Sequence, residues 1–309
     1  MRCVEWVGTL AVAAALAGCG GGGGDEIGNE PFVTPPHQLP TLAVSTATSE
    51  IVAARTVAVV TSLRSLGFWL IPSLESVSPA NPVSSFVCGG GGSSTITYVD
   101  ADGDKAVSPG DIVRFESPGC KVVAFGNGSA TVTILSVDAD GASDVRVDVA
   151  GGTLPYLEAW HWTPNLVGRF RITLNQGDVW LWSDESLRLE VSVDEWLEAS
   201  RIGLKLSYVP GNPPSPALEG GLDLTLHVAA LGEGRLQVDT VGGPVSGQAP
   251  NSAPMPGSLQ LLGVSASRLR ISDAQPVDPG SFRLQTDSMG TGVYDDDRII
   301  SFLSIFDSL

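Results

Sequence analysis

The chain has 309 residues, and 34 acidic side chains against 17 Lys and Arg give a formal net charge of −17. Because nucleic-acid binding depends on Lys and Arg side chains that neutralise phosphates, this charge excludes nucleic acid as a partner. With 43% hydrophobic and 17% charged residues the chain can bury a core, which excludes intrinsic disorder for most of its length.

Residues 1–19 have the pattern of an export signal. Arg2 gives a weakly positive start, and residues 7–17 are mostly apolar. Roughly eleven residues are too few to cross a bilayer core, which takes about twenty, so we interpret residues 1–18 as a signal peptide. The run ends in Leu16-Ala-Gly-Cys19, which resembles the lipobox of bacterial lipoproteins at all four positions. The resemblance implies cleavage before Cys19, a diacylglycerol on its thiol and acylation of its new amine.

The residues after Cys19 predict where the protein is sorted and how it is held. Gly20 stands where the lipoprotein family has Asp as an inner-membrane retention signal, so the resemblance implies a lipid anchor in the outer membrane. The folded part would then face the periplasm or the cell surface. A glycine run at 20–24 and scattered prolines up to Pro40 show no hydrophobic periodicity. Residues 19–47 are therefore predicted to be a flexible, lipidated tether.

One N-terminal helix and one short C-terminal helix are predicted. Thr48 or Ser49 offers an N-cap for the first, and Gly67 follows its last periodic apolar residue as a stop signal. The aspartates at 295–297 are expected to cap a terminal helix, because the positive end of a helix dipole favours negative charge.

From about residue 94 the apolar residues alternate with polar ones, which predicts strands. Glycine-led starts of several of these segments indicate hairpin turns, so we predict that residues 48–309 form an all-β domain. Its expected architecture is an antiparallel meander that forms a sandwich or a half-open barrel. The Pro-rich stretches 210–221 and 242–257 are interpreted as long loops, with a subdivision of the domain near 210–220 as the alternative. The clearest alternating segments are 95–99, 111–115, 130–134, 169–174, 187–193 and 202–206.

Two cysteines remain once the signal and the anchor are accounted for. Cys3 leaves with the signal peptide and Cys19 is acylated, so Cys88 and Cys120 are left in an exported chain. Exported proteins with two remaining thiols most simply pair them, and we predict a Cys88–Cys120 disulfide. Two such distant thiols match no zinc spacing.

Residues 100–111 have the spacing of a calcium loop. Oxygen ligands at relative positions 1, 3, 5, 9 and 12, with a backbone carbonyl at 7, resemble the loop of EF-hand and dockerin modules. Lys105 stands where that loop has glycine. A metal-free acidic hairpin turn is the alternative, because Asp and Gly are common in turns. The candidate calcium ligands are Asp100, Asp102, Asp104, the Ala106 carbonyl, Ser108 and Asp111.

Two Trp-X-Trp segments are candidate ligand contacts. Side chains two apart on a strand point the same way, so Trp160 with Trp162, and Trp180 with Trp182, each place two indoles on one face. They would either be buried between two layers or line a site for a sugar or an acyl chain.

The chain contains no G-x-S-x-G, H-E-x-x-H, P-loop or C-x-x-C motif. We therefore expect no enzyme, but an outer-membrane-anchored lipoprotein with a binding or structural role. Its expected partners are the membrane, through the anchor, and a glycan, a lipid or an envelope protein. The alternative is an envelope hydrolase with a carboxylate pair, since such pairs converge in space without adjacency in sequence.

Overall fold

The computed structural model describes residues 36–88, 91–120, 125–138, 141–153, 164–175, 178–183, 185–209, 215–246, 257–274 and 281–301. The expected signal peptide, Cys19 and most of the expected tether lie outside the described residues. Residues Val33–Leu309 form one compact unit, to which the following description applies.

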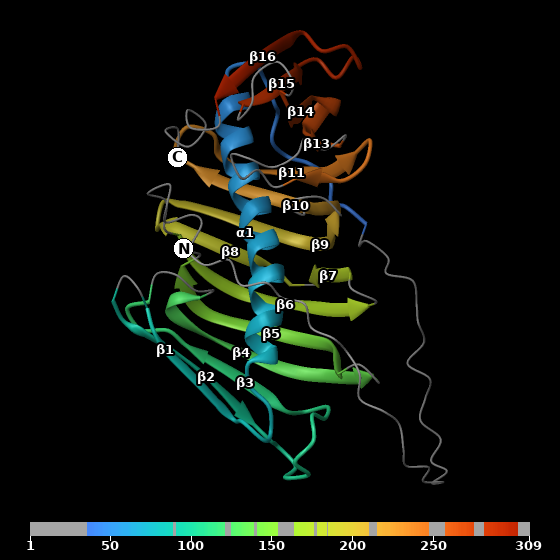
Figure 1. Cartoon of the computed structure of the whole chain (residues 1–309). Coiled ribbons are helices and arrows are strands. Elements are labelled where there is room, and N and C mark those ends of the chain that lie inside the picture. Colours follow the sequence, from blue (N-terminus) through green and yellow to red (C-terminus); the bar gives the residue numbers. More distant parts are fainter. Residues whose placement is uncertain are drawn as a thin grey trace. The chain divides into compact units, whose positions relative to one another are not determined.

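The unit is built on one antiparallel sheet of 16 strands (Figure 1). Neighbouring strands pair in chain order over most of the sheet, while β8 pairs with β6 and β9, and β12 pairs with β10. The prediction of an all-β antiparallel meander is confirmed. The strands are β1 (Val83–Val87), β2 (Ser93–Val99), β3 (Ile112–Glu116), β4 (Gly126–Asp138), β5 (Gly141–Thr153), β6 (Asn165–Asn175), β7 (Asp178–Ser183), β8 (Leu187–Ser192), β9 (Glu195–Val209), β10 (Ser215–Val228), β11 (Gly232–Val241), β12 (Val245–Ser246), β13 (Ser258–Leu262), β14 (Arg268–Asp273), β15 (Ser281–Asp287) and β16 (Asp296–Ser301).

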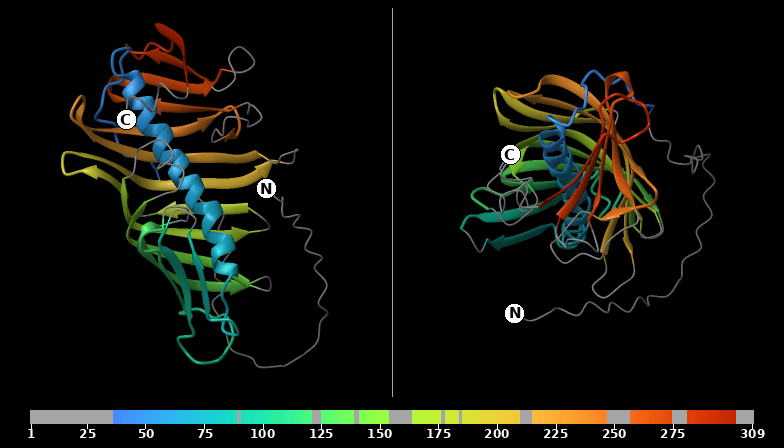
Figure 2. Two further views of the ribbon diagram at one scale, coloured as in Figure 1. Left: turned by 60° about the vertical axis from the view of Figure 1, so that its left-hand side comes forward. Right: turned by 90° about the horizontal axis from the view of Figure 1, so that it is seen from above.

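The sheet curves around the long helix α1 (Ser49–Glu75), which crosses the strands on their concave side (Figures 1 and 2). Residues 52–64 of α1 are all buried, the polar Arg55 and Arg64 among them. Arg55 Nη2 donates to Glu195 of β9, which gives the buried guanidinium a countercharge. Among the described residues, no helix combines the length and the apolar character that crossing a membrane requires.

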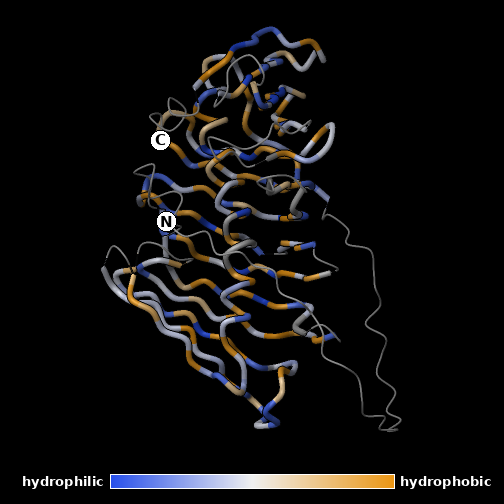
Figure 3. The backbone as a smooth tube through the Cα atoms, viewed as in Figure 1, coloured by the Kyte–Doolittle hydropathy of each residue, from blue (hydrophilic) through white to orange (hydrophobic). Residues whose placement is uncertain are grey.

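Hydrophobic and hydrophilic residues alternate along many of the strands (Figure 3). Since successive side chains of a strand point to opposite faces, one set faces α1 and the other lies on the opposite, outer face of the sheet. On β7, for example, Val179 and Leu181 are buried, while Trp180 and Trp182, which alternate with them, are only partly buried. The inner set forms one core with the helix. The outer set is polar and aromatic. A ligand that binds to this face therefore contacts polar and aromatic side chains, and not the apolar side chains that pack against α1.

Helix α1 begins where the sequence predicts but does not end at Gly67. It continues to Glu75. Gly67 lies inside the helix, at a close approach to β9, where a Cβ built on Gly67 would lie 2.2 Å from Leu206 Cδ1. The glycine thus serves close packing and not a C-cap.

Two further predictions of local structure are wrong. Residues 215–221 are part of β10 and not of a loop, and β9 pairs with β10 from Val209 and Ser215 onward, so the sheet is continuous there. The aspartates at 295–297 do not cap a helix, because Asp296–Ser301 is the edge strand β16, paired with β15.

The predicted disulfide is present. Cys88 follows β1, Cys120 lies between β3 and β4, and their Cα atoms are 5.5 Å apart. Both residues are buried. In the chain-entropy model a bond closing a loop of this size stabilises the fold by about 3 to 4 kcal/mol. It also ties the end of β1 to the neighbouring turn.

Candidate binding site on the outer face

The acidic loop brings three of its predicted ligands together. Asp100, Asp102 and Asp104 each offer one carboxylate oxygen, and these oxygens lie within 4.8 Å of one another. The same carboxylates already accept hydrogen bonds from backbone N–H groups within the loop, such as Lys105 N–H to Asp100 at 2.9 Å. Lys105 itself has a φ of 63°, the left-handed conformation that glycine would adopt more easily.

Asp111 has a different role from the other acidic residues of the loop. Its carboxylate is buried, and it accepts hydrogen bonds from the Tyr98 hydroxyl, from the Ala101 N–H at 2.8 Å and from the N–H and hydroxyl of Ser108. Burial alone would raise the pKa of Asp111, but these hydrogen bonds outweigh it and lower the pKa. Asp111 therefore anchors both ends of the loop. The Ala106 carbonyl, also expected as a ligand, accepts from the Tyr98 hydroxyl at 3.4 Å.

Calcium binding by this loop stays a prediction, and thermal unfolding tests it. If calcium binds only the folded state, stability rises by RT ln(1 + [L]/Kd), about 2.7 kcal/mol at a hundredfold excess. The unfolding temperature should thus be higher in millimolar calcium than in chelator, and Asp102→Ala should remove the difference. Lys105→Gly, which removes a positive charge, should enlarge it. Identical curves in calcium and chelator would show that the loop is only an acidic turn.

The described tryptophans of the Trp-X-Trp segments lie on the outer face, and each has a cation against its ring. The Arg171 guanidinium carbon is 4.0 Å from the ring centre of Trp182, and Lys205 Nζ is 5.4 Å from that of Trp180. One ring face of each indole is thus occupied within the protein. Trp160 and Trp162 lie outside the described residues.

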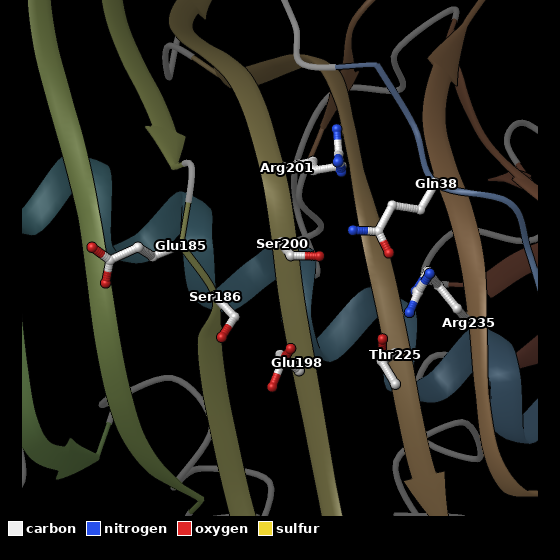
Figure 4. A pocket seen from close by; sticks show the side chains of 8 residues that line it. All are labelled: Gln38, Glu185, Ser186, Glu198, Ser200, Arg201, Thr225 and Arg235. Atoms are coloured by element: carbon white, nitrogen blue, oxygen red, sulfur yellow. The ribbon is translucent and has the colours of Figure 1, made fainter.

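A pocket of about 390 Å³ opens on the same outer face, at β8 to β11 (Figure 4). This volume falls in the range of small-molecule sites, about 300 to 1,000 Å³. Such sites are usually lined by apolar side chains, but the described residues that line this one are all polar or charged. The lining residues are Gln38, Glu185, Ser186, Glu198, Ser200, Arg201, Thr225 and Arg235.

The floor of the pocket is a row of residues across three strands. Glu198 of β9 lies opposite Thr225 of β10, which lies opposite Arg235 of β11. The Cα atoms of Glu198 and Arg235 are therefore two strand spacings apart, about 10 Å. Within the part of the chain that the structure describes, neither the Glu198 carboxylate nor the Arg235 guanidinium has an ion pair or a side-chain hydrogen bond.

A bulge in β9 adds one more residue to the lining of the pocket. Consecutive residues of a regular strand point to opposite faces, yet Ser200 and Arg201 both line the pocket. The β9–β10 register shifts at this point, and Arg201 has a φ of 49°. The irregularity thus directs a second cation to the outer face, as bulges at functional sites commonly do.

The remaining wall comes from residues 36–44, which we call the strap. His37 bridges two carboxylates, with Nδ1 at 2.7 Å from the buried Asp223 and Nε2 at 3.0 Å from Asp239. The Gln38 N–H also donates to Asp223, at 2.8 Å, and Arg201 Nη1 donates to the Pro36 carbonyl at 2.6 Å. The hydrogen bonds with Asp223 and then Asp239 raise the pKa of His37 from 6.5 to about 9, so the imidazole is charged at neutral pH.

The structured part of the chain therefore begins earlier than predicted, since residues 36–47 were expected in a flexible tether. The strap lies against β10 and β11, where the Thr41 and Leu42 N–H groups donate to the Arg235 carbonyl at 2.9 and 3.1 Å. Through Gln38 it contributes directly to the pocket.

The sequence did not point to this pocket, because its residues come from positions 38 to 235. One signal was present in part, namely the alternation that puts Glu198 and Ser200 on the polar face of their strand. Comparison of the chain with protein-family models, with curated proteins and with solved structures finds no match.

Proposed function

We propose that the protein is an outer-membrane-anchored lipoprotein whose folded part binds a glycan in the outer-face pocket. The observation that carries this proposal is the polar lining, with a carboxylate and a guanidinium that are unpaired within the described residues and whose Cα atoms lie about 10 Å apart. A ring with several hydroxyls can accept from Arg235 and donate to Glu198 at once. An acyl chain would find no apolar side chain among the described lining residues, so the lining favours the glycan over the amphiphile.

Polar groups that have no protein partner in the pocket are solvated before a ligand arrives. Glu198, Arg235 and the Gln38 side-chain amide can therefore exchange water for ligand hydroxyls without breaking a side-chain hydrogen bond to another described residue. Such a site selects ligands by the placement of hydrogen-bonding groups, because a ligand that leaves one of these groups unpaired loses affinity.

A panel of envelope-derived oligosaccharides, immobilised on an array, tests the proposal. The protein should bind a subset of them, and Glu198→Gln or Arg235→Gln should weaken that binding by about tenfold or more, as expected when a hydrogen bond to a charged group is lost. Arg114→Gln and Glu116→Gln on β3, which change the same residue types at exposed positions away from the pocket, should bind as the wild type does. Binding that is equal in all four variants would place the glycan site elsewhere.

The anchor is tested separately. Cys19→Ser should abolish palmitate labelling and leave an unprocessed or soluble protein. Undiminished labelling of that variant would refute the lipid anchor at Cys19, and the proposal of glycan binding in the pocket would be unaffected.

A carboxylate-pair hydrolase is the second candidate, because Glu185 and Glu198 line the same pocket. Figure 4 shows the Glu185 side chain pointing away from Glu198, and its Oε1 accepts from Arg169 Nη1 at 2.7 Å. Release of reducing ends from a bound oligosaccharide, lost in Glu198→Gln, would favour the hydrolase over the binding protein.

A further inference from the structure

The two edge strands of the sheet differ in their protection against pairing with another strand. β16 carries Asp296, Asp297 and Arg298, and Arg298 Nη1 forms an ion pair with Glu50 of α1 at 2.7 Å. Charged side chains on an edge strand discourage the addition of a further strand. β1, with the sequence Val-Ser-Ser-Phe-Val, has no charged residue, and four of its five residues are exposed.

The hydrogen bonds at the two ends of β1 show which of its backbone groups are free. The Tyr98 N–H donates to the Pro82 carbonyl at 2.7 Å, and the Cys88 N–H donates to the Gly92 carbonyl at 3.2 Å. Since antiparallel hydrogen bonding alternates along a strand, the even-numbered residues between them bond to β2. The N–H and C=O groups of Val83, Ser85 and Val87 therefore point away from the sheet. Within the described residues, no strand pairs with this edge.

The pattern of β1 is complementary to itself. In an antiparallel pair of two β1 strands centred on Ser85, each Ser85 faces its copy, and Val83 faces Val87 of the partner subunit. On the opposite face, Ser84 faces Phe86 of the partner subunit. Every free N–H and C=O group of the two edges finds a partner in this register, and no like charges face each other.

We infer that β1 pairs with β1 of a second copy, so that the sheets of two subunits join across a two-fold axis through Ser85. Symmetric pairing of one surface patch with itself is the commonest way in which soluble proteins form dimers. The Cys88–Cys120 disulfide holds the end of β1, so the edge is ordered before the partner arrives. Pairing also covers Val83 and Val87, which are 58% and 85% exposed in the single chain.

The charge of the chain gives this dimer a distinctive salt dependence. Two copies with a net charge of −17 each repel one another, and β1 contributes no ion pair to offset the repulsion. Because salt screens repulsion between solvent-exposed charges, the dimer should become more stable as the ionic strength rises. An interface based on ion pairs would weaken instead.

A cysteine at the two-fold axis tests the inference in the anchored, full-length protein. Cα atoms of a hydrogen-bonded antiparallel pair lie about 5.5 Å apart, which suits a disulfide. Ser85→Cys should therefore form a disulfide-linked species of twice the subunit mass in oxidised cell envelopes. Ser84→Cys, one residue away, faces Phe86 of the partner subunit and should stay largely uncrosslinked.

Sedimentation velocity of the detergent-solubilised protein supplies the second measurement. The wild type should sediment as a dimer, more completely at higher salt. Ser85→Lys, which places two ammonium groups face to face, should sediment as a monomer that is still folded, with the circular dichroism spectrum of the wild type. Its unfolding temperature should be lower, because the variant loses the stabilisation that dimerisation gives the folded chain and the hydrogen bond from Ser85 Oγ to Thr95 Oγ1. A monomeric wild type, equal crosslinking of both cysteine variants, or a crosslinked product of another mass would overturn the inference.

Discussion

Gly67→Val should lower the free energy of unfolding by about 1 to 3 kcal/mol, the usual cost of forcing extra atoms into a packed core. The first added atom alone would lie 2.2 Å from Leu206 Cδ1, and Leu206 is fully buried, so it has little room to turn away. Valine has a higher helix propensity than glycine by a few tenths of a kcal/mol, which offsets only part of this cost. Helix α1 would have to move away from β9, which weakens the contact between helix and sheet.

Denaturant unfolding of a double-mutant cycle measures this contact. Leu206→Ala alone should cost about 2 to 5 kcal/mol by leaving a cavity. In the Leu206→Ala background, Gly67→Val should cost much less than in the wild type, or should restore stability, because the valine fills the cavity. Additive effects of the two substitutions would show that Gly67 and Leu206 do not meet, and that α1 lies elsewhere on the sheet.

The sequence was most informative where one physical signal dominated. Alternation over segments such as 95–99 and 202–206 reports directly which side chains face the core. Four of the six such segments lie entirely in strands, and the other two, 111–115 and 187–193, each extend one residue beyond their strand. The disulfide could also be predicted, because counting the cysteines left a single pair. In both cases the prediction could be made without knowing which distant elements of the chain lie next to one another.

Signals that have two physical meanings led to errors. A glycine after an apolar helical pattern can be a C-cap or a point of close approach, and only the position of Leu206 shows that Gly67 is the second. Three consecutive aspartates can cap a helix or protect an edge strand with charge, and those at 295–297 precede and enter β16. In each case a strand that is a neighbour in space resolves the ambiguity: β9 for Gly67 and β15 for the aspartates. The local sequence does not show which strand that is.

The strap and the pocket could not be found from the sequence for a related reason. His37 stands among prolines without periodicity, so residues 36–47 look like a tether. Its partners Asp223 and Asp239 are 186 and 202 residues away in the chain. In the sequence, Asp223 and Asp239 look like ordinary polar residues of alternating strands, so nothing there indicates that a distant histidine contacts both of them.

His37→Ala should lower stability at neutral pH and remove an alkaline transition that the wild type shows. The folded-state pKa of about 9 exceeds the ordinary value of 6.5 because Asp223 and Asp239 hold the imidazolium. Stability from this group is therefore fully present below pH 6.5 and is lost as the pH rises through about 9. At about 1.4 kcal/mol per pKa unit, the shift corresponds to about 3 kcal/mol, and the His37 side chain is only 20% exposed.

Urea unfolding of both proteins between pH 6 and pH 10 measures the difference. The wild type should lose stability relative to His37→Ala over this range, and the two should converge above about pH 9. His227→Ala is the matched control, because it removes the other histidine in the described residues while leaving the strap intact. A His37→Ala protein with the same alkaline fall as the wild type would contradict the bridge between His37 and the two aspartates.

Deprotonation of His37 should also weaken glycan binding at the proposed site, because His37 holds the strap that forms one wall of the pocket. Gln38 follows His37 and lines the pocket, so loss of the imidazolium releases one wall of the site while Glu198 and Arg235 remain in their strands. Glycan affinity should then fall as the pH rises through about 9 in the wild type, and it should be low and independent of pH over this range in His37→Ala. An affinity that follows pH equally in both proteins would mean that the strap does not build the site.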